Sequence, residues 1–151
     1  MSNIPLGPGP EIVPLSIWTE NHITAIYKAT NLADFDKAFD AFISKDAQIT
    51  LNGRKLTREE YKLQLVGETF AEKSANVSFL GAVDVPEKVI GLTQTGTVGV
   101  FFQATVFGRL LFRGAPVTST VNASLNATVA AGKSGTTVTV LNEVVVDHVN
   151  H

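Results

Sequence analysis

An alternation of apolar and polar side chains, broken only at Ser119, runs through residues 117–129 and constrains the fold more than any other feature of the chain. The even positions are all polar: Thr118, Thr120, Asn122, Ser124, Asn126 and Thr128. A period of two residues is typical of a β-strand that buries one face. Residues 98–112 alternate in the same way, with their apolar face at the even positions. Residues 138–148 carry valines at 138, 140, 144 and 146, which predicts that the even face of this last strand is buried too.

The chain changes character near residue 75. Of the 18 valines, 16 lie at or after that position, whereas 18 of the 26 charged residues lie before it. The first half predicts three helices. The first spans residues 14–30, the second begins near residue 34, and the third begins at a capping box formed by Thr57-Arg58-Glu59-Glu60. Short strands are expected at residues 47–52 and 75–85. Helices followed by strands indicate an α+β domain in which three N-terminal helices pack on one face of an antiparallel sheet.

Length and composition exclude several classes of protein. A chain of 151 residues fits one domain, here residues 14–151, preceded by a flexible arm rich in proline and glycine at residues 1–13. The formal charge of −2 argues against a strongly basic nucleic-acid binder, and the absence of cysteine removes disulfides and thiolate metal sites. Residues 89–108 are uncharged, but polar residues interrupt them, so buried strands are expected rather than a membrane span. No leader pattern is visible, and we expect a cytoplasmic protein without metal or cofactor.

The face of the sheet turned away from the helices is expected to be partly apolar. The odd positions of two strands carry the apolar residues concerned, and these are Phe101, Phe107, Leu111, Leu141 and Val145. Such a patch needs a cover. A second copy of the chain, packed sheet against sheet, is the favoured cover, and the alternatives are the N-terminal arm or an uncovered monomer.

The expected order α-α-β-α-β-β-β-β resembles the nuclear-transport-factor-two-like superfamily, also called SnoaL-like. Residues 31–35 look like the family's link between its first two helices, and residues 38–42 followed by 46–53 look like its passage from the second helix into the first strand. The resemblance implies a cone-shaped, curved sheet around three helices, an apolar pocket and, in many members, a homodimer. Members range from isomerases and dehydratases to plain binding domains, so the fold alone does not fix the function.

The residues that enzymes of this family use can be sought one by one. Steroid isomerases place a general-base aspartate in the first strand, and the matching residues 49–52 hold no carboxylate. His22 lies one helical turn after Trp18 and is the candidate general acid or base, although a surface histidine at the helix edge is the alternative. Asn142 interrupts the even face of the last strand and would bond His22, a backbone group or a ligand. The predicted pocket comprises Trp18, His22, Phe39, Phe102 and Asn142, and Glu143 is expected on the opposite face, at the dimer contact or in solvent.

Three functions follow as hypotheses. The first is a pocket protein that binds a small apolar molecule without a cofactor. The second is a cofactor-independent isomerase, dehydratase or cyclase that acts on a polyketide- or terpenoid-like compound through His22. The third is a protein-interaction module that uses the outer sheet face.

Overall fold

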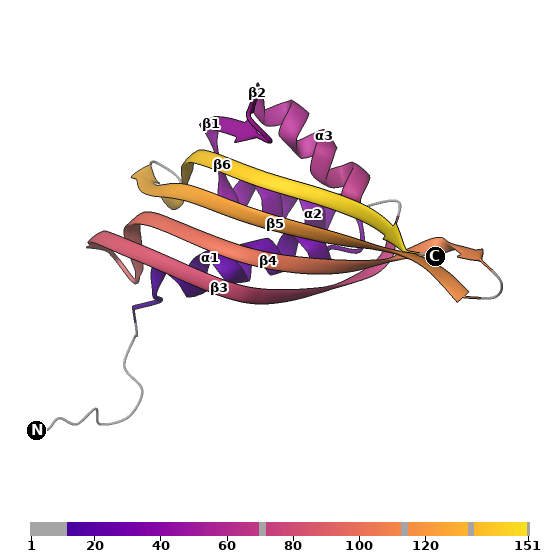
Figure 1. The fold of residues 1–151 in the computed structure, drawn as a ribbon. Helices are drawn as coiled ribbons and strands as arrows, with labels where there is room; N and C mark the ends of the chain where they lie inside the picture. Colours follow the sequence, from indigo (N-terminus) through magenta and orange to yellow (C-terminus); the bar gives the residue numbers. More distant parts are fainter. Residues whose placement is uncertain (1–11, 70–71, 113–114, 133–134, 151) are drawn as a thin grey trace, which may run out of the picture.

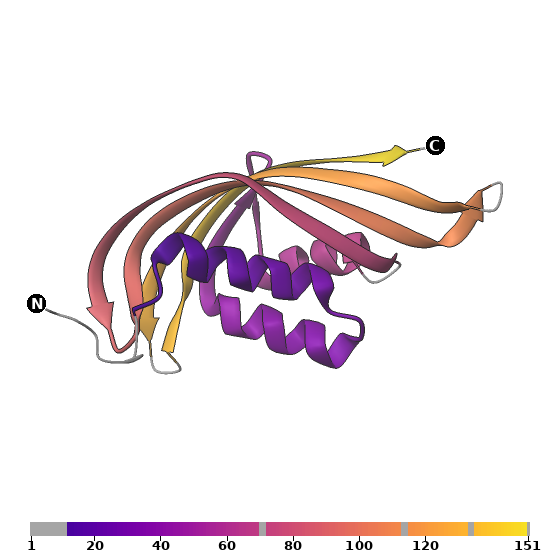
Figure 2. The same ribbon diagram turned by 90° about the horizontal axis from the view of Figure 1, so that it is seen from below.

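The structure, a computed structural model, describes residues 12–69, 72–112, 115–132 and 135–150 (Figure 1). Its elements are α1 (Leu15–Lys28), α2 (Leu32–Phe42), β1 (Ile43–Leu51), β2 (Arg54–Leu56), α3 (Arg58–Thr69), β3 (Glu72–Ile90), β4 (Thr93–Phe112), β5 (Ala115–Gly132) and β6 (Gly135–Asn150). The strands form one sheet in the order β2-β1-β6-β5-β4-β3. The sheet curves over the three helices, which all lie on its concave side (Figure 2).

The predicted α+β architecture is confirmed, with two additions that the sequence pattern did not indicate. The Asn52-Gly53 turn joins β1 to the short strand β2, and both turn residues have positive φ angles. The sheet is antiparallel except between β1 and β6, which run parallel. The parallel pair arises because the chain leaves β1 through β2 and α3, crosses to the far edge of the sheet at β3, and returns strand by strand.

Helix α1 begins without a capping side chain of its own, because Pro14 stands at the cap position. The sheet supplies the missing acceptors. The backbone N–H of Leu15 donates to Gln94 Oε1 and that of Ser16 donates to Asp84 Oδ2, each at 2.9 Å. A carboxylate at a helix N-terminus also interacts favourably with the helix dipole. The start of α1 is therefore fixed to β3 and β4.

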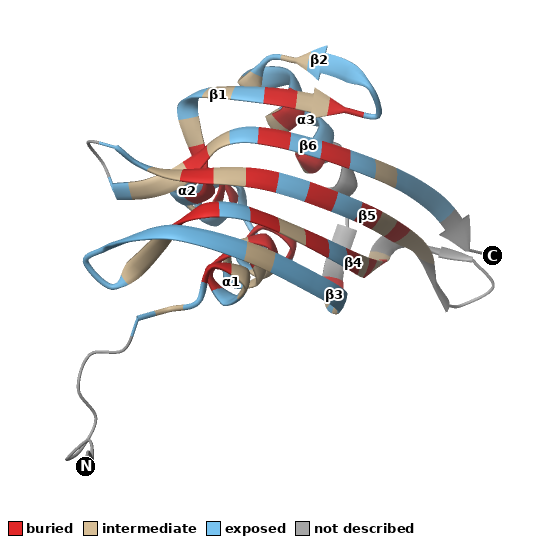
Figure 3. Ribbon diagram, turned by 60° about the vertical axis from the view of Figure 1, so that its left-hand side comes forward, coloured by how far each residue is buried: buried red, intermediate tan, exposed pale blue. Residues whose placement is uncertain are grey.

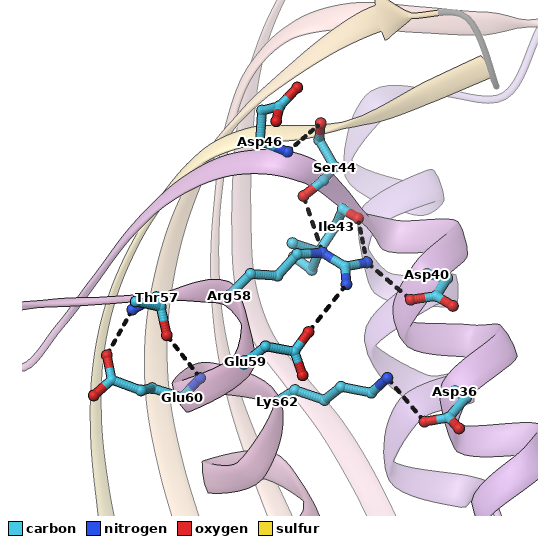
Figure 4. A network of polar contacts seen from close by, with 10 residues as sticks. All are labelled: Asp36, Asp40, Ile43, Ser44, Asp46, Thr57, Arg58, Glu59, Glu60 and Lys62. Atoms are coloured by element: carbon cyan, nitrogen blue, oxygen red, sulfur yellow. Dashed lines mark hydrogen bonds and ion pairs between the residues drawn. The ribbon is translucent and has the colours of Figure 1, made fainter.

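The capping box predicted at the start of α3 is present. The backbone N–H of Thr57 donates to Glu60 Oε1 at 2.8 Å, and that of Glu60 donates to Thr57 Oγ1 at 3.1 Å (Figure 4). This reciprocal pair satisfies backbone donors that the first turn leaves free. It sets the rotation of α3, which directs Tyr61 and Leu65, the buried residues among those of α3 whose burial is described, toward the sheet.

Arg58 fastens α3 to the junction of α2 and β1. Its guanidinium donates to Asp40 Oδ1 at 2.8 Å and to the carbonyl oxygens of Ile43 and Ser44 at 3.0 and 3.1 Å (Figure 4). It also lies 4.8 Å from the centroid of the Phe39 ring. Three acceptors and an aromatic ring hold the planar guanidinium in one orientation. Arg58 therefore links α3 to α2 and β1.

The alternation predicted for β4 and β5 is confirmed by burial. The even residues of β4 from Val98 to Val106 and the odd residues of β5 from Val121 to Val129 all face the helices and are buried (Figure 3). They form the core together with the aromatic side chains of α2, among which Phe35, Phe39 and Phe42 are at most 2% exposed.

The prediction that the even face of β6 is buried is confirmed at Val138 and wrong at the even residues that follow, and a β-bulge is the reason. Thr128 and Val129 of β5 pair with Val140 and Val138, so Thr139 is an extra residue on β6. An extra residue turns every following side chain to the other face. Beyond the bulge, Leu141, Glu143 and Val145 point inward and the even residues Val140, Asn142, Val144 and Val146 point outward.

Candidate functional site

A small space lies between the helices and the concave face of the sheet. Its volume is about 10 Å³, which is close to the room that one water molecule needs. Its lining is apolar except for one carboxyl and two tyrosines, and the residues are Ile23, Ile26, Tyr27, Phe42, Tyr61, Leu65, Phe102, Leu125 and Glu143. The interior of the cone is thus packed nearly shut.

Glu143 is the polar centre of this interior. The side chain is 2% exposed, and it is the one carboxylate among the buried residues that the structure describes. The Tyr61 hydroxyl donates a hydrogen bond to Glu143 Oε1 at 2.6 Å. Hydrogen bonds from a hydroxyl to a carboxylate are short and stronger than neutral ones, and a low-dielectric interior strengthens them further. The two groups can hold or exchange a proton away from bulk water.

Asn52 fixes the position of Glu143 on β6. The backbone N–H of Asn52 donates to the Glu143 carbonyl at 2.9 Å. The Asn52 side chain then pairs with Val145 as a strand residue would: Nδ2 donates to the Val145 carbonyl at 3.0 Å, and the Val145 N–H donates to Oδ1 at 2.8 Å. The hairpin turn between β1 and β2 therefore clamps the segment of β6 that carries the carboxyl.

Tyr61 is held from the other side by α2. Its ring lies 6.1 Å from the Phe39 ring, measured between centroids, and the side chain is 3% exposed. The capping box and Arg58 fix the first turn of α3. Tyr61 follows directly in the helix, so these contacts also set the direction of its hydroxyl toward β6.

The predicted pocket residues do not come together in one place. Trp18 and His22 lie beside each other, with ring centroids 4.3 Å apart, and His22 stacks on Phe42 at 5.6 Å. His22 lines an open groove between α1 and α2, of about 420 Å³, rather than the interior space. Burial lowers the pKa of its imidazole below the usual value, which favours the neutral ring.

The remaining predicted residues divide between core and surface. Phe102 lines the interior space and packs edge-on against Tyr27, at 5.9 Å between centroids. Phe39 is fully buried in the core of α2. Asn142 is exposed on the outer face of the sheet, so the prediction that it faces the pocket is wrong because of the bulge at Thr139.

The predicted outer-face residues also need correction. Phe101 is 46% exposed and Phe107 is half-buried on the outer face, as expected. Leu141 is 1% exposed and Val145 packs against the core, so both belong to the concave face instead. Leu111 lies in β4, but its side chain is outside the described residues.

Sequence reasoning missed both members of the interior polar pair. Glu143 was expected in solvent or at a dimer contact because β6 was read without its bulge. Tyr61 had a signal that was available: with Leu65 it forms an i, i+4 pair directly after the capping box, which marks the inward face of α3.

Within the described part of the chain, no three His, Asp or Glu side chains gather in a way that could hold a metal ion. Among the same residues, no helix is both long and apolar enough to cross a membrane.

Comparison with known proteins identifies the fold. No protein-family model matches the sequence, and no curated protein does. A conserved protein from Planctomyces limnophilus DSM 3776 superposes with a TM-score of 0.58 at 10% identity, over 86% of this chain and 92% of its own. Mtr2 from Candida albicans gives 0.54 at 9% identity, over 88% and 94%.

An NTF2-like protein of unknown function from Exiguobacterium sp. 255-15 gives a TM-score of 0.51 at 15% identity, over 87% of this chain and 98% of that one. At identities this low, the structural superpositions establish the fold and leave the function open. The chain has the nuclear-transport-factor-two-like fold that the sequence resemblance indicated.

Proposed function

We propose that this chain of the nuclear-transport-factor-two-like fold binds a small, largely apolar molecule in its interior, with Glu143 and Tyr61 as the polar contacts. The observation that carries the proposal is the buried hydrogen-bonded pair set in an otherwise apolar lining. Burying a carboxyl is costly, and cores rarely contain one unless it is paired, as Glu143 is with Tyr61. Apolar walls with a few convergent polar groups are the usual makeup of a small-molecule site.

The volume of the interior sets a condition on this function. A space of about 10 Å³ cannot hold an organic ligand, so binding requires side chains to move. Outward movement of α3 beyond its first turn, which Arg58 and the capping box fix, would enlarge the space, because Leu65 on the following turn lines it. This displacement would also bring the Glu143 carboxyl into contact with the entering molecule.

A fluorescence titration with N-phenyl-1-naphthylamine tests the proposal, since this neutral probe has an apolar body and one N–H donor. We expect saturable binding by the natural chain and tighter binding by Leu65→Ala, which enlarges the space. Glu143→Gln keeps the shape and removes the charge, so we expect binding about tenfold weaker. Leu63→Ala is the matched control, because Leu63 is 70% exposed on the same helix. No saturable binding, or equal binding by all four proteins, would refute an interior site.

A catalytic form of the same proposal is favoured by the geometry of the pair. A carboxylate that accepts the proton of a tyrosine hydroxyl at 2.6 Å is arranged for general acid–base chemistry, with Glu143 rather than His22 as the base. Small molecules released by denaturing the natural chain and Glu143→Gln distinguish binding from turnover. If Glu143 catalyses a reaction, the variant should release a substrate that is an isomer of the compound released by the natural chain, or that differs from that compound by one water molecule. The same compound on both proteins would leave binding as the function.

A further inference from the structure

Asn52 and Gly53 form the only Asn-Gly sequence in the chain. In this dipeptide the backbone nitrogen of the glycine can attack the side-chain carbonyl carbon of the asparagine, because glycine has no Cβ to obstruct the approach. Ammonia leaves and a succinimide ring forms, which water then opens to aspartate or to isoaspartate. The net reaction is the hydrolysis of one amide, with water as the co-reactant. Of all asparagines in the sequence, Asn52 is therefore the one whose following residue favours deamidation most.

The hairpin turn between β1 and β2 presents this dipeptide to water. Both residues are exposed, and their φ angles are 51° and 82°. Two consecutive residues with positive φ are typical of a type I′ turn. A Cβ atom built on Gly53 would meet nothing within 4 Å, so the space beside that residue is open. Water can therefore reach the turn without any opening of the core.

The side-chain amide of Asn52 is held by β6 in the folded chain. Its Nδ2 donates to the Val145 carbonyl at 3.0 Å, and its Oδ1 accepts from the Val145 N–H at 2.8 Å. The regular pairing of β1 with β6 ends at Leu51 and Glu143, so these two bonds, here called the Asn52 clamp, extend the ladder by one side chain. The Asn52 Cγ atom must turn toward the Gly53 nitrogen to react. Deamidation of the folded chain therefore requires the clamp to open first.

Both products of deamidation break the Asn52 clamp. In aspartate a carboxylate oxygen replaces the Nδ2 donor, and it would face the Val145 carbonyl, which is also an acceptor. Two acceptors without a proton between them repel each other. In isoaspartate the main chain runs through the former side chain, so the group that paired with Val145 becomes part of the backbone. Neither product can keep both bonds to β6.

We propose that Asn52 is a deamidation site, and that its conversion releases the segment of β6 that holds Glu143 against Tyr61. Asn52 contacts this segment through its backbone N–H, which donates to the Glu143 carbonyl at 2.9 Å, and through the clamp on Val145. When the clamp is lost, the 2.6 Å hydrogen bond between Tyr61 and Glu143 opens more readily. Hydrolysis of the amide runs in one direction, so the interior of the protein changes with the age of the molecule. This inference does not require the interior to bind a ligand.

Timed incubation of the whole folded chain at mildly alkaline pH, followed by peptide mapping with mass spectrometry, tests the modification. Labelling with an isoaspartyl methyltransferase distinguishes isoaspartate from aspartate. We expect Asn52 to convert while Asn126 and Asn142 stay intact, because these two are also exposed but precede Ala127 and Glu143 instead of glycine. In guanidinium chloride, where the bonds to Val145 are absent, we expect Asn52 to convert at least about tenfold faster.

Hydrogen–deuterium exchange at the Val145 N–H tests the release of β6. Asn52→Asp supplies one product directly, and the aged natural chain supplies the mixture of both. Asn126→Asp is the matched control, because it places the same charge at an exposed position of β5. We expect exchange at least about tenfold faster in Asn52→Asp and in the aged chain, and unchanged exchange in Asn126→Asp. Circular dichroism should show that both variants are folded, because both positions are exposed.

Each result decides for or against the inference. An Asn52 that stays intact as long as Asn126 and Asn142 overturns the deamidation site. Equal rates of conversion in the folded and the unfolded chain overturn the hold of β6 on the amide. Unchanged exchange at Val145, in Asn52→Asp and in the aged chain alike, overturns the release of the segment that carries Glu143.

Discussion

Leu141 and Asn142 are neighbours on β6, and their relative effect on stability tests the bulge at Thr139. Leu141 is 1% exposed on the concave face, whereas Asn142 is exposed on the outer face. Leu141→Ala removes three buried carbon atoms, worth about 2.4 kcal/mol of transfer free energy, and leaves a cavity that adds to the cost. We expect a loss of about 3 kcal/mol in the free energy of unfolding. At this chain length that corresponds to a fall in Tm of roughly 6–12 °C. Asn142→Ala should stay within about 0.5 kcal/mol.

Urea unfolding followed by fluorescence measures both variants on the same footing. The chain has one tryptophan, Trp18, which is 7% exposed and therefore reports directly on the loss of the core. Both variants are measured at one low protein concentration, because any self-association would add to the apparent stability. If Asn142→Ala costs as much as Leu141→Ala, β6 has no bulge, and the inward placement of Glu143 is refuted with it.

Three other substitutions test separate parts of the structure. Asp84→Ala removes the acceptor at the start of α1 and should lower the free energy of unfolding by about 0.5–2 kcal/mol, while Glu87→Ala, exposed on the same strand, should have little effect in the same urea titration. Tyr61→Phe leaves the buried Glu143 carboxyl without its hydroxyl donor and should cost about 1.5–3 kcal/mol; adding Glu143→Gln should recover part of that loss, which a double-mutant cycle measures. The His22 pKa is lowered in the folded state, so below a pH of about 6.5 unfolded chains bind the proton more readily and stability falls. His22→Gln should lack this part of the fall, and parallel Tm profiles for the two proteins would contradict the burial of the ring.

The parts of the fold that were predicted correctly rest on patterns that one element carries alone. Residues 117–129 alternate at every position except Ser119, so the buried face of β5 can be assigned without knowing its neighbours. The capping box at Thr57 and Glu60 likewise needs only four consecutive residues. Each of these signals lies within a single element and allows a single structural interpretation.

The parts that were missed depend on contacts between distant segments. The parallel pairing of β1 with β6 follows from the path of the whole chain, and the short strand β2 exists because Asn52 and Gly53 turn the chain back on β1. The face of β6 was unpredictable for a different reason. Residues 140–146 are apolar at both odd and even positions, so either face could be the buried one, and the bulge against β5 decides it.

The bulge at Thr139 determines the interior and the outer surface together. Because it shifts β6 by one residue, it brings Glu143 to Tyr61 and at the same time turns Val140 and Val144 outward. In an unbulged strand that continued the pairing of Val129 with Val138, Asn142 would pair with Leu125 in the place of Glu143, and the carboxyl would stand on the outer face. The proposed interior site therefore requires this local irregularity, because without it an amide rather than a carboxyl would stand opposite the Tyr61 hydroxyl.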